Sequence, residues 1–152
     1  MLRIIADSTC DISKEDARKM GIQIVPISVR FGDEEFLDGV EITHEEFYTR
    51  LAECDELPKT SQPSPDTFMK VFNEAVAAGD DVLGIFISSD LSGTYQSACL
   101  AALDVEEETG KKTEIKFLQL NLWVECTKVE HAPEYLIEQI ATLQPDIATF
   151  CE

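Results

Sequence analysis

The fold of this chain is decided by residues 81–103, which read DVLGIFISSDLSGTYQSACLAAL. Residues 82–87 form a short apolar run that contains Val, Ile and Phe, a pattern typical of a buried strand. A hydroxyl-rich turn follows, and Tyr95 then opens a helical pattern rich in Ala and Leu. The stretch therefore predicts a strand that leads through a polar turn into a helix.

This turn has properties that suit an anionic ligand. The first N–H groups of a helix lack intrahelical partners and carry the positive end of the helix dipole, so an anionic group can sit there. Gly93 has no Cβ that would keep a ligand away from the backbone. The neighbouring Ser and Thr side chains add hydrogen-bond donors. A purely structural role is the alternative, because Ser and Asp commonly cap helices and close turns.

The rest of the chain repeats the alternation of strands and helices. Capping signals at Ser13, at Thr43 with Glu46, and at Ser64 with Pro65 predict three helix starts. Apolar runs predict strands at residues 2–6, 22–31 (interrupted by Pro26), 35–37, 82–87, 115–120 and 147–150, and a further helix is expected at 132–143. This order predicts an α/β fold with a mainly parallel sheet and helices on both faces. Ligands of such sheets bind at the carboxyl ends of the strands.

The charge balance restricts the partners of the chain. The 152 residues contain 30 Asp and Glu against 12 Lys and Arg, which gives a net charge of −18. Nucleic acids and anionic membranes both require a basic footprint, so neither is expected as a partner. No apolar run approaches the ~20 residues that span a bilayer. The length is typical of one domain.

The cysteines and histidines argue against a metal site. The five cysteines, at positions 10, 54, 99, 126 and 151, contain no C-x-x-C pair, and His44 and His131 are the only histidines. We therefore expect no metal and no cofactor. An odd number of cysteines, with no signal peptide in view, predicts free thiols and a cytoplasmic location.

Three motifs together resemble the amino-terminal domain of the DegV family. They read ADSTCD at 6–11, KTSQPS at 59–64 and SSDLSGTYQSA at 88–98. The resemblance covers about residues 2–104 of a single domain, and residues 105–152 diverge from the family pattern. Members of this family are bacterial lipid-binding proteins, and some are the carrier subunit that presents a fatty acid to a separate fatty acid kinase. The resemblance thus implies a carrier of a long-chain fatty acid and not an enzyme.

The resemblance also implies which residues bind the fatty acid. The family's carboxylate-binding threonine falls on Thr60 and its carboxylate-binding serine falls on Ser92. Ser61, Ser89 and Gly93 lie in the same two motifs and are secondary candidates. Hydroxyls and a helix N-terminus can hold a carboxylate without a fixed cation, because each hydrogen bond to a charged group contributes about 1.5–3 kcal/mol.

Two departures from the family pattern qualify this expectation. The family has a second, carboxy-terminal domain that closes over the ligand, and the sequence ends at Glu152 without it. The Asp-Ser motif and the Gly-rich turn that follow the family's fourth strand are also missing here. The apolar tunnel that the resemblance implies would therefore need a wall from another chain. We expect the chain to self-associate through the face that the missing wall leaves open.

Other classes of function remain as alternatives. The chain can be a truncated DegV-like domain that acts as an oligomerisation or interaction module without lipid transport. A serine hydrolase built on Ser92 would need a base within hydrogen-bond reach, and no motif places His44 or His131 there. A phosphotransferase is not favoured, since the sequence shows no nucleotide-binding motif.

Overall fold

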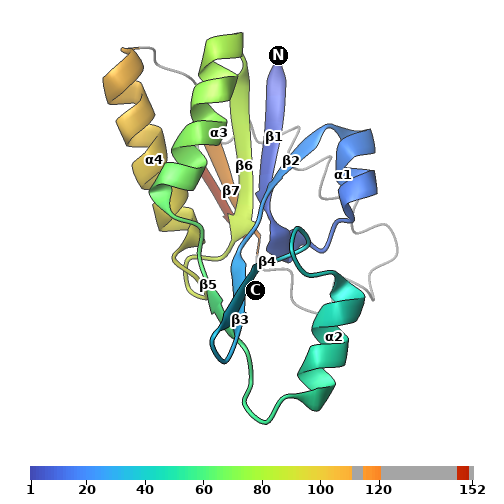
Figure 1. Ribbon diagram of the computed structural model, residues 1–152. Coiled ribbons are helices and arrows are strands. Elements are labelled where there is room, and N and C mark those ends of the chain that lie inside the picture. Colours follow the sequence, from blue (N-terminus) through green and yellow to red (C-terminus); the bar gives the residue numbers. More distant parts are fainter. Residues whose placement is uncertain (111–114, 121–146, 151–152) are drawn as a thin grey trace.

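The computed structural model describes residues 1–110, 115–120 and 147–150. Within these ranges, five parallel strands form the larger sheet, in the order β2-β1-β6-β7-β8. Their bounds are β1 Leu2–Asp7, β2 Ile22–Val25, β6 Asp81–Ile87, β7 Ile115–Leu120 and β8 Ile147–Phe150. The expected parallel sheet is confirmed, and β1 and β6 lie side by side at its centre (Figure 1).

A second, smaller sheet is antiparallel. It contains β4 (Glu34–Leu37), β3 (Ser28–Phe31) and β5 (Lys59–Ser61), in that order. The prediction of one bent strand over residues 22–31 is wrong, because β2 and β3 belong to different sheets. Pro26 lies between them and has no N–H for a ladder, so the chain leaves the large sheet there. The strand predicted at residues 35–37 is confirmed as part of β4, which pairs with β3 in an antiparallel hairpin.

Four α-helices in the described residues complete the fold, and each of the three cap signals begins one. Their bounds are α1 Lys14–Met20, α2 His44–Glu53, α3 Pro65–Ala78 and α4 Thr94–Thr109. The side chain of Ser13 accepts the N–H of Asp16, and Ser64 caps α3 in the same way. Thr43 and Glu46 form a reciprocal capping box at the start of α2. These local hydrogen bonds satisfy N–H groups that a helix cannot pair internally.

Helices lie on both faces of the large sheet. α3 and α4 pack against each other and against β6, while α1 packs beside β2 (Figure 1). β2 lies on one side of β1 and β6 lies on the other. The connection from β1 to β2 and the later connection from β2 to β6 therefore run in opposite directions along the sheet. Because such crossovers are right-handed, α1 lies on the face opposite to α3 and α4.

The main core lies between the large sheet and the pair α3 and α4. Phe68 is fully buried, and its ring packs edge-on against Phe86 of β6 with the centroids 5.2 Å apart. Small buried residues of α4, among them Ala98 and Ala101, let this helix approach closely. Val82 and Phe86 alternate with partly exposed residues along β6, as expected for a strand with a well-covered face.

Some predictions concern residues at the edge of what the structure describes. The strands predicted at Ile115–Leu120 and Ile147–Phe150 are confirmed as β7 and β8. The helix predicted at 132–143 lies outside the described residues, as do His131, Cys126 and Cys151. Among the helices in the described ranges, none has the length and apolar character that a bilayer crossing requires.

Candidate functional site

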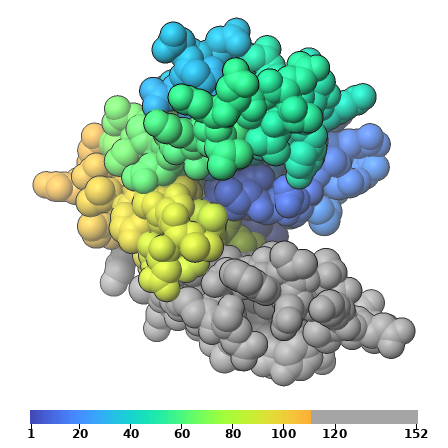
Figure 2. Space-filling model, turned by 90° about the horizontal axis from the view of Figure 1, so that it is seen from below, coloured from blue at the N-terminus to red at the C-terminus, as the bar shows by residue number. Residues whose placement is uncertain are grey.

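A pocket of about 520 Å³ lies at the carboxyl ends of β1 and β6, beside the smaller sheet. Seen from below, the yellow surface around the start of α4 lies close to the green surface that includes β5 and to the blue surface of the chain after β1 (Figure 2). Four of the five predicted site residues line this pocket, and Ser89 does not. The lining residues are Thr9, Ile27, Thr60, Ser61, Gln62, Ile87, Leu91, Ser92 and Gly93.

Thr60 and Ser61 reach the pocket from β5. This strand pairs with β3, so that Thr60 lies opposite Val29 and Ser61 lies opposite Ser28. Both residues are exposed, and their hydroxyls have no hydrogen-bond partner within the described part of the chain. These hydroxyls are therefore available to a ligand.

Ser92 reaches the same pocket from the turn before α4. Its Oγ accepts the backbone N–H of Thr94 at 3.3 Å and lies 2.9 Å from the Thr94 hydroxyl. The N-cap residue of α4 is Gly93, which has no side chain that could cap the helix. The turn thus presents a hydroxyl beside the positive end of a helix dipole, as the sequence predicted.

The first turn after β1 contributes Thr9, which sequence reasoning did not select. The buried carboxylate of Asp7 accepts both the backbone N–H of Thr9, at 2.9 Å, and the Thr9 hydroxyl proton. The Thr9 hydroxyl is therefore occupied as a donor. Asp7 directly follows the strand predicted at residues 2–6 and lies in one of the three motifs, which is the signal that could have identified it as an organising residue.

Gly93 has a different neighbour from the one expected. A Cβ at this position would lie 2.2 Å from Oε1 of Gln62, which is far below van der Waals contact. The backbone φ of Gly93 is −77°, a value open to any residue. The Gln62 side chain thus occupies the space that a Cβ at position 93 would take. Gly93 also lines the pocket, and the close approach of a ligand to its backbone stays a prediction.

The pocket lining is neutral. None of its nine residues carries a charged side chain, although the chain as a whole has a net charge of −18. Ile27, Ile87 and Leu91 supply apolar surface, and Thr60, Ser61, Gln62 and Ser92 supply polar groups. Such a lining can hydrogen-bond the carboxylate of an amphiphile and contact the start of its apolar chain.

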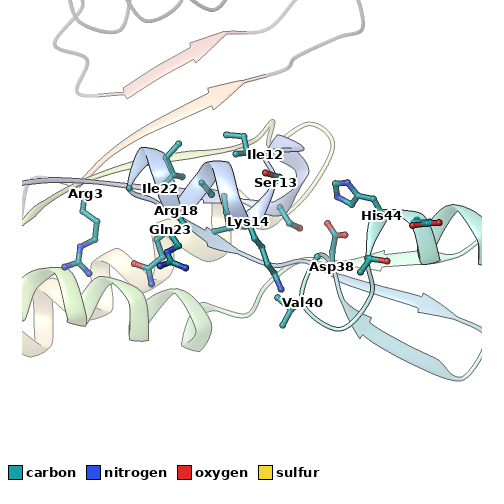
Figure 3. A pocket seen from close by; sticks show the side chains of 17 residues that line it. Arg3, Ile12, Ser13, Lys14, Arg18, Ile22, Gln23, Asp38, Val40 and His44 are labelled. Carbon is teal, nitrogen blue, oxygen red and sulfur yellow. The ribbon is translucent and has the colours of Figure 1, made fainter.

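A second, larger pocket of about 910 Å³ lies between α1, β2 and the start of α2. In Figure 3, Arg3 and Gln23 lie toward one end, His44 lies at the other, and Lys14 lies between them. Ser92 lines the first pocket and its hydroxyl contacts Thr94, whereas His44 lines the second pocket. The two do not form a nucleophile and base pair, so this geometry gives no support to a hydrolase built on Ser92 and His44.

Cys10 follows the lining residue Thr9 in the short 3₁₀ helix η1 (Ser8–Cys10). Burial raises the pKa of the Cys10 thiol, and the negative charge of Asp7 raises it further. A thiol with a raised pKa is a weak nucleophile at neutral pH. The cysteines in the described residues are free thiols that form no disulfide: Cys10, Cys54 and Cys99.

Comparisons with known proteins identify relatives of this chain. A DegV domain-containing protein of Clostridium perfringens is 44% identical over 107 residues, which cover 70% of this chain and 38% of that protein. A solved stearic acid-binding protein from Eubacterium ventriosum is 34% identical, with a TM-score of 0.74 over 99% of this chain and 50% of that chain. The fatty acid kinase B3 protein of Streptococcus pneumoniae, solved with linoleic acid, has a TM-score of 0.67 over 95% of this chain and 54% of that chain. Its identity of 24% shows a likeness of fold.

The chain spans about half, or less, of the length of these relatives. A family model described as "Uncharacterised protein, DegV family" matches residues 1–142. This match covers most of the chain, and the structural likeness to the Eubacterium protein extends over nearly all of it. The chain therefore belongs to the DegV family.

Proposed function

We propose that this chain binds a long-chain fatty acid and holds the carboxylate with the hydroxyls of Thr60 and Ser92. The observation that supports the proposal is that β5 and the turn before α4, which are far apart in the sequence, bring these two hydroxyls to one neutral pocket. Ser61 adds a third hydroxyl, while Ser89 is a weaker candidate since it does not line the pocket. The bacterial relative from Eubacterium is named as a stearic acid-binding protein.

The expected energetics fit an amphiphilic ligand. A carboxylate that accepts a hydrogen bond from each of two hydroxyls gains about 1.5–3 kcal/mol per bond. Each buried CH₂ of the acyl chain adds ~0.8 kcal/mol. The apolar side chains of Ile27, Ile87 and Leu91 are placed to contact the first carbons of that chain. Most of the affinity thus comes from the acyl chain, and the hydroxyls select the head group.

The finer proposal is that the chain is a carrier subunit that presents the carboxylate to a fatty acid kinase. Its support is the family resemblance together with the name of the Streptococcus protein, whose likeness is one of fold. A carrier needs no catalytic groups of its own, and the uncharged lining of the pocket is compatible with that role. A cytoplasmic location accompanies this proposal, supported by the unpaired thiols of Cys10, Cys54 and Cys99.

Isothermal calorimetry with palmitate tests the carboxylate site. Thr60→Ala and Ser92→Ala should each weaken binding by roughly tenfold, the loss of one charge-assisted hydrogen bond, while Thr60→Ser should change it little. Thr49→Ala is a matched control, because the Thr49 hydroxyl lies on α2 and donates to the backbone carbonyl of Glu45. Wild-type affinity in both site variants would refute the assignment.

The second candidate function is an interaction module that no longer carries lipid. Leu91 lines the pocket with 65% of its surface exposed, which leaves apolar surface open to a partner or a second copy of the chain. Extraction of the purified protein followed by mass spectrometry distinguishes the two functions. A bound C14–C18 acid supports the carrier, whereas an empty protein that sediments as an oligomer supports the module and the predicted self-association.

A further inference from the structure

The side chain of Gln62 crosses from the end of β5 to the first turn of α4. Its Nε2 donates a hydrogen bond of 3.2 Å to Oγ of Ser97, a residue that is 3% exposed. Gln62 follows Thr60 by two positions, and Gly93 follows Ser92 directly. The amide therefore connects the backbone segments that carry the two proposed carboxylate-binding hydroxyls.

The amide of Gln62 occupies the space that a Cβ at position 93 would take, so any other residue there would have to move this side chain. A Cβ built on Gly93 would lie 2.2 Å from Oε1, 2.6 Å from Nε2 and 2.7 Å from Cδ of Gln62. The backbone at Gly93 has a negative φ, which any residue can adopt. The glycine therefore matters because it lacks a Cβ and leaves room for the amide, and not because of its backbone conformation. Even alanine would displace the amide and break its hydrogen bond to Ser97.

Few other contacts fix the position of β5. It is a strand of three residues at the edge of the smaller sheet, it pairs with β3, and its residues are all exposed. Ser92, by contrast, lies at the start of a helix of 16 residues that packs in the main core. The hydrogen bond from Gln62, the residue directly after β5, to buried Ser97 thus connects an exposed edge strand to a helix of the main core.

We propose that Gln62 is a positioning residue that sets the distance between the hydroxyls of Thr60 and Ser92, and that Gly93 and Ser97 form its seat. This inference rests on the proposed function, since it explains how the carboxylate site is organised before the ligand arrives. Groups that are already in place lose less freedom on binding, so a pre-arranged pair of hydroxyls binds more tightly than a loose pair.

A direct contact between Gln62 and the ligand is the competing explanation, because Gln62 also lines the pocket. The variant Ser97→Ala separates the two explanations, since Ser97 is not a lining residue. Positioning predicts that palmitate binds roughly three- to tenfold more weakly to Ser97→Ala, the effect of one lost hydrogen bond. Direct contact predicts unchanged affinity, and that result would overturn the proposal.

A double-mutant cycle between positions 62 and 93 provides the second test. Gln62→Ala and Gly93→Ala should each weaken palmitate binding by a similar factor, because each removes the amide from its seat. The double variant should bind no more weakly than Gln62→Ala alone, since the new Cβ then enters vacated space. Losses that simply multiply would contradict the proposed seat.

Nuclear magnetic resonance of the unliganded wild-type protein keeps this test independent of lipid binding. The side-chain amide protons of Gln62 should show an NOE to the Hα protons of Gly93, and Ser97→Ala should weaken it. If the NOE is present and palmitate does not bind, the proposed function is wrong while the contact stands. If the NOE is absent in the wild type, the positioning role is wrong whatever the affinity for palmitate.

Discussion

The carboxylate of Asp7 accepts the backbone N–H of Ile87 through Oδ2 at 2.8 Å, and this hydrogen bond joins the carboxyl ends of the two central strands. Oδ1 of the same carboxylate accepts the N–H and the hydroxyl of Thr9. Asp7 is 1% exposed. Because Thr9 and Ile87 both line the candidate pocket, this one buried side chain holds together two parts of its wall.

Asp7→Asn should therefore destabilise the protein. All three partners of Asp7 are donors, and an amide group has a single acceptor oxygen, so at least one N–H or O–H would face an NH₂ group. A hydrogen bond to a buried charged group contributes about 1.5–3 kcal/mol, and we expect a loss of that size in the free energy of unfolding. Urea denaturation followed by circular dichroism measures this loss.

Asp11→Asn is the matched control for this prediction. Asp11 is exposed in the same turn, and its φ of 53° is a left-handed conformation that Asn adopts readily. The control variant should be as stable as the wild type. Equal stability of Asp7→Asn and Asp11→Asn would mean that the buried carboxylate is not needed.

The helix boundaries could be predicted from sequence because their determinants are local. Ser13 directly precedes α1 and Ser64 directly precedes α3, and the structure places each at the predicted helix start. Gly21 and Gly79 end the same two helices. Short-range hydrogen bonds and left-handed glycines leave a clear pattern in sequence. The parallel sheet could be predicted for a related reason, since alternating strands and helices permit few other arrangements.

The second sheet and the contacts of the site could not be predicted in this way. Lys59, Thr60 and Ser61 contain no apolar side chain, and their strand conformation depends on pairing with β3. The approach of Gln62 to Gly93 likewise depends on tertiary distances that no spacing encodes. Thr60 and Ser92 were selected through the family resemblance, whereas the residues alone indicated only a hydroxyl-rich turn before a helix.

Stability in acid should depend on Asp80. Its Oδ2 lies 2.9 Å from Nη2 of Arg3 and its Oδ1 lies 3.1 Å from the N-terminal ammonium group. The hydrogen bond from Arg3, followed by that from the ammonium group, holds the pKa of Asp80 below its ordinary value of 3.8. A carboxyl group whose pKa is lowered by folding stabilises the folded protein at pH values above the ordinary pKa of the group. This contribution is lost as the pH falls through the folded-state pKa.

We therefore expect Asp80→Asn to be less stable than the wild type at pH 7 and to lose less stability than the wild type below about pH 3.8. Urea midpoints measured from pH 7 to pH 2.5 give both quantities. Asp81→Asn, at the exposed neighbouring position, serves as the control. Parallel pH profiles of Asp80→Asn and the wild type would exclude Asp80 as a source of the acid dependence.

Cys99 should react slowly with alkylating reagents at neutral pH. Burial raises the pKa of its thiol above the ordinary value of 9.0, despite a hydrogen bond with Tyr95 that lowers it. Burial, together with the contact with Cys99, raises the pKa of Tyr95 to about 12. The reactive thiolate is thus scarce at pH 7.5, and labelling should accelerate as the pH rises. Iodoacetamide labelling with peptide mass spectrometry measures the rate, and an equal rate in native and urea-unfolded protein would contradict this account.

The last prediction concerns the hydroxyl of Thr94, which is completely buried and has Ser92 Oγ, 2.9 Å away, as its partner within the described residues. A buried hydroxyl proton without an acceptor is costly, so Thr94 donates to Ser92. The backbone N–H of Thr94 also donates to Ser92 Oγ. Ser92 therefore accepts twice within the turn, and its own proton remains free to be donated to a carboxylate in the pocket.

Thr94→Val keeps the shape of the side chain and removes this hydroxyl, so the Ser92 proton is no longer directed into the pocket. Palmitate should bind roughly three- to tenfold more weakly to Thr94→Val, and Thr94→Ser should retain wild-type affinity. Thr49→Val provides the control, because it removes a hydroxyl that donates to a backbone carbonyl on α2, away from the pocket. Calorimetry on the three variants decides the matter: unchanged affinity in Thr94→Val would show that Ser92 orients its proton without help from Thr94.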